Sequence, residues 1–170
     1  MATTSDARHF SSVSSEAFRA AMADLPAAVS IITTTSAAGV PHGATVSAVT
    51  SLSQDPPMLL VCLDEASDTL AALGPGRRFV VHIVSDGLQD TAMAFATKGA
   101  AKFDGTDWTY SASGQPLIAG ASVVFDCTVE SFCVGGDHTI VVGMIHAIEH
   151  SADRPPVVYH RWRMRPTIPA

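Results

Sequence analysis

The chain has 170 residues, of which 47% are hydrophobic and 15% are charged, and its formal net charge is −6. The length suits a single domain with one core, and the negative charge argues against nucleic acid as the main partner. No apolar run is long enough to span a membrane, and no signal-peptide core precedes residue 15. We therefore expect a cytoplasmic protein, and its sparse charge, against about 25% in typical soluble domains, hints at a homodimer.

The polar residues 1–14 predict a flexible N-terminal arm, residues 15–165 a single domain, and residues 166–170 a short C-terminal tail. Ser15 can cap a short helix that Pro26 ends. The apolar side chains of this helix fall on one side and are Phe18, Met22 and Leu25. The pattern therefore predicts an amphipathic helix ahead of the first strand.

A β-branched strand is predicted over residues 28–35. A turn over residues 36–41 then returns the chain antiparallel into a second strand, residues 43–55. At the two-residue period of a strand, one face of this second strand carries a row of hydroxyls from Thr45, Ser47, Ser51 and Ser53. A flat polar ligand could lie close to the backbone there and hydrogen-bond to it. The same alternation also describes an ordinary half-buried strand whose hydroxyl face meets water.

The rest of the chain alternates strands with two more short helices. Ser67 can cap a helix over residues 68–73, and the next helix is predicted to end at Phe95. The predicted strands cover residues 58–63, 78–84, 123–130, 138–149 and 157–160, with an irregular excursion over residues 104–120. About seven strands, three short helices and no βαβ alternation predict a mainly β fold, a closed or split antiparallel barrel.

Polar side chains near these two helices could bind an anion. Backbone N–H groups at the start of the first helix can hold phosphate, helped by the Ser67 and Thr69 hydroxyls. Neighbouring acidic residues would repel phosphate there, so an ordinary capped helix explains the same pattern. Two lysines follow the second helix, where each could neutralise a phosphate or simply be solvated: Lys98 and Lys102.

Neither the cysteines nor a histidine-rich segment predicts a metal site. Cys62, Cys127 and Cys133 are odd in number, and no pair has the CxxC spacing of a zinc site or a redox dithiol. Residues 146–150, His-Ala-Ile-Glu-His, match a zinc-protease pattern that requires a helix, but they follow a clear strand. The chain also lacks a Gly-x-Gly-x-x-Gly fingerprint, so a nicotinamide cofactor would bind without the Rossmann motif.

A set of segments, in a fixed order along the chain, carries a family resemblance. The segments are Pro41–Pro57, Val61–Asp64, Ser67–Thr69, Phe95–Lys98, Lys102–Phe103, Gly136–Gly143 and Tyr159–Arg161. In this order they resemble the short-chain flavin reductases, the NAD(P)H:flavin oxidoreductase components of two-component flavin-dependent monooxygenases. The resemblance implies an antiparallel split β-barrel of the FMN-binding type. It also implies reduction of FMN or FAD by NADH or NADPH, through hydride transfer to the flavin N5, for a partner oxygenase.

The resemblance further implies which residues bind the cofactors. The hydroxyl-bearing strand would lie along the isoalloxazine and ribityl chain, and the segment from Cys62 to Thr69 would continue toward the phosphate. His138 would be the catalytic residue near the nicotinamide, orienting its ring or donating a proton to reduced flavin. The implied cofactor-binding residues are Thr45, Val46, Ser47, Ala48, Ser51, Ser53, Cys62, Leu63, Asp64, Ser67, Thr69, Phe95, Lys98, Lys102, Tyr159 and Arg161.

Departures from the family pattern keep other functions open. Ser47 stands where the family commonly has Asn, and Trp162 stands at a glycine position, where it could fill space for a nicotinamide or adenine. A histidine that begins a strand, such as His138, is also commonly a structural hydrogen-bonding group. Two alternatives therefore stand beside the reductase: a flavin-binding module without turnover, and a barrel recruited to different chemistry on an organic substrate.

Overall fold

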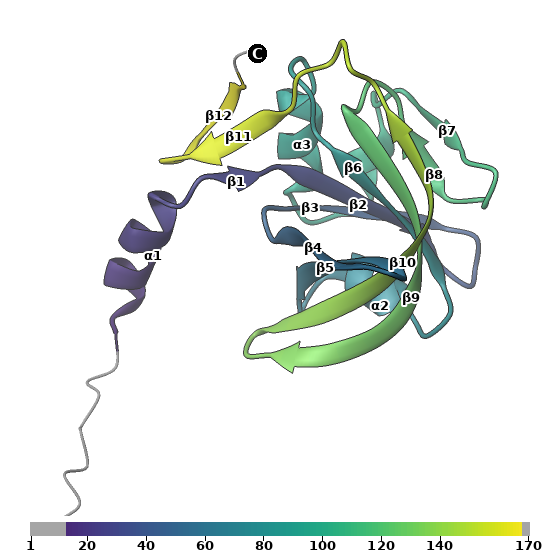
Figure 1. Ribbon diagram of the computed structural model, residues 1–170, viewed down its shortest axis with the longest axis horizontal. Helices are drawn as coiled ribbons and strands as arrows, with labels where there is room; N and C mark the ends of the chain where they lie inside the picture. Colours follow the sequence, from purple (N-terminus) through teal and green to yellow (C-terminus); the bar gives the residue numbers. More distant parts are fainter. Residues whose placement is uncertain (1–12, 168–170) are drawn as a thin grey trace, which may run out of the picture.

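The computed structural model describes residues 13–167 and is mainly β with a few short helices. Its main sheet has seven strands in the order β3-β2-β6-β9-β10-β5-β4, each antiparallel to its neighbours. The sheet is strongly curved (Figure 1). Its strands are β2 (Ser30–Thr35), β3 (Pro41–Val46), β4 (Val49–Gln54), β5 (Pro57–Asp64), β6 (Arg78–Ile83), β9 (Val123–Gly135) and β10 (His138–His150). The predicted mainly β, antiparallel class is confirmed.

One core cluster lies on the inner face of this sheet. Val61, Phe79 and Val141, from β5, β6 and β10, are completely buried in it. At Gly143 of β10 a Cβ atom would lie 2.5 Å from Cζ of Phe79, closer than non-bonded carbons approach. Glycine at this position therefore lets the Phe79 ring pack directly against β10.

A second core cluster lies between β2 and a layer of short elements. Ile31 of β2, Phe95 and Ile118 are its largest buried side chains. A short hairpin, β7 with β8, occupies part of the stretch predicted to be irregular. The elements of this layer are α3 (Gln89–Phe95), η1 (Ala100–Phe103), β7 (Trp108–Tyr110) and β8 (Pro116–Ile118). The helix α2 (Asp68–Ala72) packs instead against the first cluster, through Leu70.

A buried histidine joins the main sheet to β8. His82 of β6 is 1% exposed, with Nδ1 3.1 Å from the carbonyl oxygen of Ile31 and Nε2 accepting the N–H of Ile118 at 3.1 Å. These contacts require a neutral ring with its proton on Nδ1. Burial disfavours the charged form and lowers the pKa of His82 to about 4, although the Ile31 carbonyl opposes this shift.

The hydroxyl-bearing segment predicted as one strand, residues 43–55, is two strands. The chain bends at Ser47 and Ala48, and β3 and β4 on either side of the bend are the two outermost strands of the sheet. The bend arises because β3 pairs with β2 whereas β4 pairs with β5. Ala48 already accepts a hydrogen bond from Cys62 N–H of β5 at 3.0 Å. Alternation of side chains continues through the bend and conceals it in the sequence.

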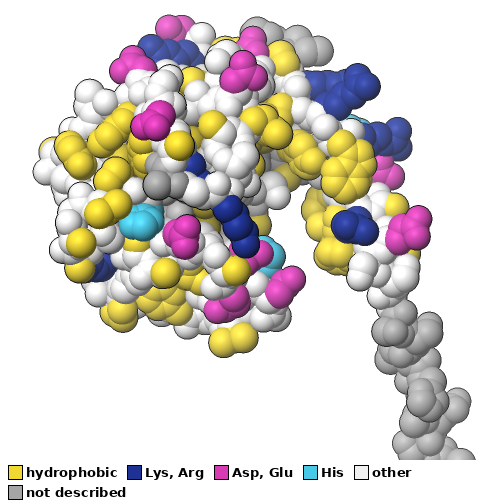
Figure 2. Space-filling model, turned by 180° about the vertical axis from the view of Figure 1, so that it is seen from behind, with side chains coloured by type: hydrophobic (Ala, Val, Ile, Leu, Met, Phe, Trp, Pro, Cys, Tyr) yellow, Lys and Arg dark blue, Asp and Glu magenta, His cyan; other side chains and the backbone are white. Residues whose placement is uncertain are grey.

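A separate unit, here called the extension, consists of α1 and a three-stranded sheet in the order β1-β11-β12. Its elements are α1 (Ser15–Ala23), β1 (Ala27–Ala28), β11 (Val157–His160) and β12 (Arg163–Pro166). Figure 1 shows α1 standing away from the main sheet, and none of its residues is buried. In Figure 2 hydrophobic side chains lie along this projecting helix, including its side toward the body. The extension therefore leaves an apolar helix face uncovered.

The N-cap of α1 is Ser14 rather than the predicted Ser15, because the Ser14 side chain accepts the N–H of Ala17 at 3.2 Å. The predicted flexible arm lies outside the described residues except for 13 and 14, and the predicted tail does so from residue 168. Within residues 13–167, no helix is long and apolar enough to cross a membrane.

Candidate functional site

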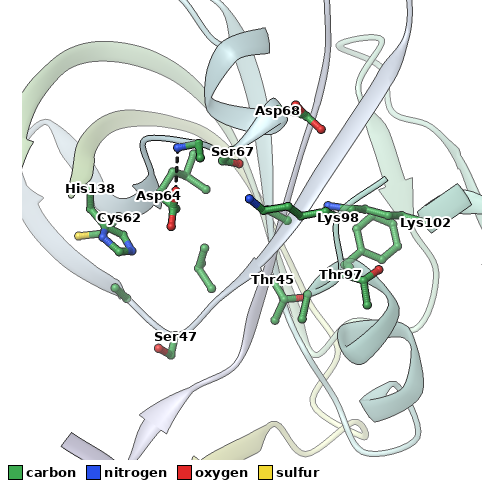
Figure 3. Close-up of a pocket in the computed structure, with 17 residues that line it drawn as sticks. Thr45, Ser47, Cys62, Asp64, Ser67, Asp68, Thr97, Lys98, Lys102 and His138 are labelled. Carbon is green, nitrogen blue, oxygen red and sulfur yellow. Dashed lines mark hydrogen bonds between the residues drawn. The ribbon is translucent and has the colours of Figure 1, made fainter. Parts of the chain in front are cut away.

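An open cavity of about 340 Å³ lies beside the bend that connects β3 to β4 (Figure 3). Its walls come from the end of β3, the end of β5, the start of α2, the segment after α3 and the start of β10. This volume is at the lower end of the range of about 300–1,000 Å³ for small-molecule sites. The lining residues are Ala44, Thr45, Val46, Ser47, Ala48, Cys62, Leu63, Asp64, Ala66, Ser67, Asp68, Phe95, Ala96, Thr97, Lys98, Lys102 and His138.

The wall formed by β3 is fixed by three contacts, two to α3 and one to η1. The Thr45 hydroxyl donates a hydrogen bond to the Ala92 carbonyl at 2.6 Å, and the Lys102 ammonium donates to the Gly43 carbonyl at 2.9 Å. The Phe95 ring lies directly on Gly43, where a Cβ atom would approach its Cε1 atom to 2.4 Å. Thr45 therefore lines the cavity while its hydroxyl hydrogen is used within the fold.

Ser47 lies at the bend and remains exposed at the edge of the cavity. Figure 3 shows its hydroxyl on the side opposite Ser67 and Asp68. With Ala44 and Ala48 on either side, this wall has no bulky side chain. A flat ring can therefore approach the backbone here, as the sequence analysis expected.

The opposite side of the cavity begins at the start of α2. The Asp64 carboxylate accepts the N–H of Ala66 at 2.7 Å, and the Ser67 hydroxyl accepts the N–H of Leu70 at 3.4 Å. Both side chains are thus engaged in local turn and cap contacts, as in the ordinary capped helix considered above. These contacts hold the segment in place beside the cavity.

Two lysines supply positive charge to the site in different ways. Lys102 is half-buried, and this burial lowers its pKa, while Asp68 raises it in part. Lys98 is exposed, and Figure 3 shows its ammonium group pointing into the cavity. Lys98 is therefore the more exposed of the two charges, and Lys102 is held by its hydrogen bond to β3.

His138 begins β10 directly beside the end of β5, in register with Asp64. Its Nδ1 lies 2.8 Å from Oδ1 of Asp137, and this contact lowers the pKa of the exposed Asp137 carboxyl. Cys62 faces the same side of the sheet, because its register partner Ile140 is two residues from His138. The Asp137 contact engages Nδ1 and orients the imidazole at the cavity wall.

The structure brings most of the predicted site residues together, but it places five of them elsewhere. Ser51 and Ser53 lie on β4, beyond the bend, and neither lines the cavity. The pairing of β4 with β5 shifts register between these two residues. Thr69 is 1% exposed and lines a smaller neighbouring cavity instead. The bend therefore separates Ser51 and Ser53 from this cavity, and their role in flavin binding stays a prediction.

Tyr159 and Arg161 belong to the extension rather than to the cavity. Tyr159 packs against the second core cluster. Arg161 donates from Nε to the Asp24 carboxylate at 2.5 Å, and its backbone N–H donates to the Ala23 carbonyl at 2.8 Å. Both residues therefore hold the β11–β12 hairpin in place within this chain.

The cavity also includes residues that were not predicted as site residues. The most polar of these are Thr97, whose hydroxyl donates to the Ala94 carbonyl at 2.7 Å, and Asp68. Small residues give no chemical signal in a sequence, although most of this set lies within the resembling segments quoted above. The complete set is Ala44, Ala66, Asp68, Ala96 and Thr97.

Together these walls fit a planar polar ring that carries an anionic tail. Small side chains and backbone groups line one side, and two lysines lie together at the far end of the cavity. Hydroxyls, backbone amides and close packing are what such a ring requires, since a flavin brings its own redox chemistry. Within the described part of the chain, no cluster of three or more His, Cys, Asp or Glu side chains could hold a metal ion.

Comparison with known proteins supports this interpretation. The family described as Flavin reductase like domain matches residues 22–167. The actinorhodin polyketide dimerase of Streptomyces coelicolor is 36% identical over 141 residues, which cover 83% of this chain and 80% of that protein. A flavin-dependent monooxygenase reductase subunit, HsaB, of Rhodococcus jostii is 32% identical over 144 residues, which cover 85% and 73%.

A solved structure has the same fold. The NADH:FAD oxidoreductase SgcE6 of Streptomyces globisporus C-1027 matches with a TM-score of 0.83 and 30% identity, over 94% of this chain and 98% of that one. Two further relatives, both from Rhizobium meliloti, are longer, and the chain spans 43% and 59% of their length. The family match covers most of the described residues and every wall of the cavity. The chain therefore belongs to the flavin reductase like domain family.

Proposed function

We propose that this chain is an NAD(P)H:flavin oxidoreductase that reduces FMN or FAD and supplies the reduced flavin to a separate flavin-dependent oxygenase. The observation that carries the proposal is the cavity itself, with an unobstructed wall at Ser47 and two lysines at its far end. A bound flavin would accept hydride from a reduced nicotinamide. Relatives that include a monooxygenase reductase subunit and an NADH:FAD oxidoreductase support the same reaction and the same kind of partner.

The residues of the cavity have distinct roles in this proposal. Ser47 and the backbone beside it contact the edge of the flavin ring, and Lys98 binds the anionic tail as a charge free to move toward it. His138, oriented by Asp137, lies where a nicotinamide would stack and holds or donates a proton through Nε2. Cys62, Leu63 and Asp64 complete the wall between these ends.

The proposal includes a split barrel and a homodimer. The two outermost strands of the sheet, β3 and β4, are joined only by the bend at Ser47 and Ala48, so the curved sheet approaches closure there. Phe18 of α1 is 58% exposed, and Leu25, just after the helix, is 57% exposed. A second copy of the chain that covers this face would bury apolar surface that this chain leaves in water. A cytoplasmic location remains a prediction of the sequence.

The test is to mix the purified chain with NADH or NADPH and FMN or FAD and follow the absorbance of the reduced nicotinamide. We expect oxidation of the nicotinamide only when flavin is present. Flavin binding without oxidation would support the flavin-binding module without turnover. Neither binding nor oxidation would contradict a flavin site altogether and favour different chemistry in the same cavity.

A substitution tests whether the flavin binds within the cavity. Ser47→Tyr puts a large ring at the bend, so we expect flavin binding to be lost while the thermal unfolding transition is retained. The matched control is Ser53→Tyr, which adds the same ring on β4 away from the cavity. Unchanged flavin affinity in Ser47→Tyr would show that the flavin lies elsewhere.

A further inference from the structure

A cavity of about 450 Å³, here called the hairpin cavity, lies between α3 and the β11–β12 hairpin. Gln89 and Met93 line it from α3, and Tyr159 and residues 162–165 line it from the hairpin. None of these residues lines the candidate functional site. The hairpin cavity is therefore a separate surface, whose ligand need not be a cofactor.

The hairpin cavity follows the outer edge of β12. Residues 162–165 all line it, although neighbouring side chains of a strand point to opposite faces. Within residues 13–167, β12 pairs with β11 on one edge and with no strand on the other. The residues that flank a two-residue turn form a hydrogen-bonded pair, so the backbone groups of Met164 point to the open edge. Pro166 has no N–H to add there, so side chains must supply most of the binding.

The turn of this hairpin holds an exposed tryptophan in a backbone conformation that favours glycine. Arg161 and Trp162 have φ angles of 48° and 64°, and a turn with two positive φ angles is usually Asn-Gly. Trp162 is nevertheless 65% exposed, so burial within the described residues does not offset the strain of its backbone. A partner that covers the indole ring would offset it, since buried tryptophans contribute much of the binding energy at protein interfaces.

Two arginines of β12 give the hairpin cavity a positive charge. Arg163 and Arg165 are exposed and lie on one face of the strand. Arg161 pairs with Asp24, but in the part of the chain that the structure describes neither Arg163 nor Arg165 forms a salt bridge. Figure 2 shows Lys or Arg side chains next to hydrophobic ones where the body meets the projecting helix. On a chain with a net charge of −6, this surface selects for carboxylates.

We propose that the hairpin cavity is a docking site for an extended acidic segment of a partner protein. Arg163 and Arg165 are two residues apart, a spacing that matches carboxylates at alternate positions of an extended chain beside β12. Trp162 and Met93, 65% and 57% exposed, provide apolar contacts on either side of that segment. Trp, Met and Arg are residue types that are enriched at protein interfaces. The proposal does not depend on the proposed function, because it involves no residue of the flavin cavity.

The first experiment measures binding of two labelled peptides to the full chain by fluorescence anisotropy. The first peptide has about ten residues in which Glu alternates with Val, and in the second Lys replaces every Glu. We expect only the acidic peptide to bind, and its dissociation constant to rise about tenfold when sodium chloride is raised from about 50 to 300 mM. Absence of binding, or equal binding of the two peptides, would overturn the proposal.

The second experiment removes the two charges by combining Arg163→Gln with Arg165→Gln. We expect the dissociation constant of the acidic peptide to rise about tenfold. The matched control combines Arg19→Gln with Arg154→Gln, two exposed arginines that do not line the hairpin cavity. An equal loss of binding in both double variants would show that the peptide follows overall charge, which contradicts a specific site.

The third experiment, Trp162→Gly, separates docking from folding. Glycine adopts a φ of 64° without strain, so we expect the free energy of unfolding not to fall. The dissociation constant of the acidic peptide should rise at least about tenfold, while Val134→Ser, an exposed apolar control on β9, leaves it unchanged. Unchanged peptide binding in Trp162→Gly would overturn the proposal. Loss of self-association in sedimentation velocity, without peptide binding by the parent chain, would assign the hairpin cavity to a second copy instead.

Discussion

The helices α1 and α3 are both short and amphipathic, yet only α3 buries its apolar residues. Ala92 and Phe95 of α3 are 0% and 1% exposed, against 58% for Phe18 and 46% for Met22 of α1. Both helices have the spacing that predicts one apolar face. An apolar face in the sequence therefore predicts that a helix can pack against another surface. Whether that surface belongs to the same chain depends on the fold.

Different contacts explain the difference. α3 is fixed to β3 through Thr45 and packs on Gly43, whereas the end of α1 is held by hydrogen bonds from Arg161 to Ala23 and Asp24. A nine-residue helix is too short to be stable by itself in water. The apolar face of α1 is therefore left without a cover within the described residues 13–167.

The largest effect is expected when the pH is lowered, because the buried histidine His82, which joins β6 to β8, must then resist protonation. Folded His82 has a pKa of about 4, against 6.5 for an ordinary histidine. The unfolded chain therefore binds a proton between these values that the folded chain does not, and stability falls as the pH drops through this window. The stability that comes from keeping His82 neutral is fully present above pH 6.5. The free energy of unfolding then declines by about 3 kcal/mol toward pH 4.

The measurement is urea unfolding at both ends of that window, with His82→Gln as the matched variant. Glutamine can donate to the Ile31 carbonyl and accept from the Ile118 N–H, but it does not titrate. We expect the variant to lose less stability on acidification than the parent chain. Equal losses of unfolding free energy in the variant and the parent chain would show that His82 is accessible to water.

The next effect tests the packing of α3 on β3. Gly43→Ala places a Cβ atom 2.4 Å from the buried Phe95 ring, so the ring or the strand must shift, and we expect a loss of about 1–3 kcal/mol. Gly74→Ala is the control, because its Cβ would meet nothing closer than 3.9 Å. Similar unfolding free energies for the two variants would remove the contrast between α3 and α1.

A smaller effect tests the hydrogen bond between the two elements. Thr45→Val keeps the shape of the side chain but removes the donor to the Ala92 carbonyl, which should lower the free energy of unfolding by about 1 kcal/mol. Thermal unfolding and flavin titration separate the two possible roles of Thr45. Unchanged stability with a clear loss of flavin affinity would identify its hydroxyl as a flavin ligand instead.

The smallest effect on the stability of the main sheet is expected from a substitution in α1. Phe18→Ser should leave the unfolding of the sheet unchanged, since none of the helix is buried against it. It should weaken self-association in sedimentation velocity by removing apolar surface from the interface. Arg19→Ser on the same helix is the control. Destabilisation of the sheet by Phe18→Ser, with no change in association, would mean that α1 packs on its own chain.

Much of the fold was predictable because its strands are locally encoded. The β-branched run of β2 and the alternating residues of β9 predict strands without reference to the rest of the chain. The bend at Ser47 and Ala48 was not predictable, because it depends on which strands pair with β3 and β4. The β7–β8 hairpin was missed for a similar reason, since its strands are short and surrounded by turn residues.

The site was predictable where the family resemblance supplied residues and not where tertiary contacts assign their roles. The resemblance indicated Ser47, Lys98 and His138, and all three line the cavity. The bond that fixes Lys102 to the Gly43 carbonyl joins residues 59 positions apart, so no local pattern shows it. Tyr159 packs against the second core cluster, away from the cavity, and its predicted role as a flavin ligand stays a prediction.

The placement of β3 and β4 at opposite edges also constrains the order of assembly during synthesis. Residues 30–64 form two hairpins, β2–β3 and β4–β5, which supply both margins of the sheet before any of its centre exists. The centre comes from β6, β9 and β10, the last of which ends at His150. Until β10 inserts between β9 and β5, a nascent chain exposes unpaired strand edges. The pocket is thus completed only after His138, its last lining residue along the chain, has left the ribosome.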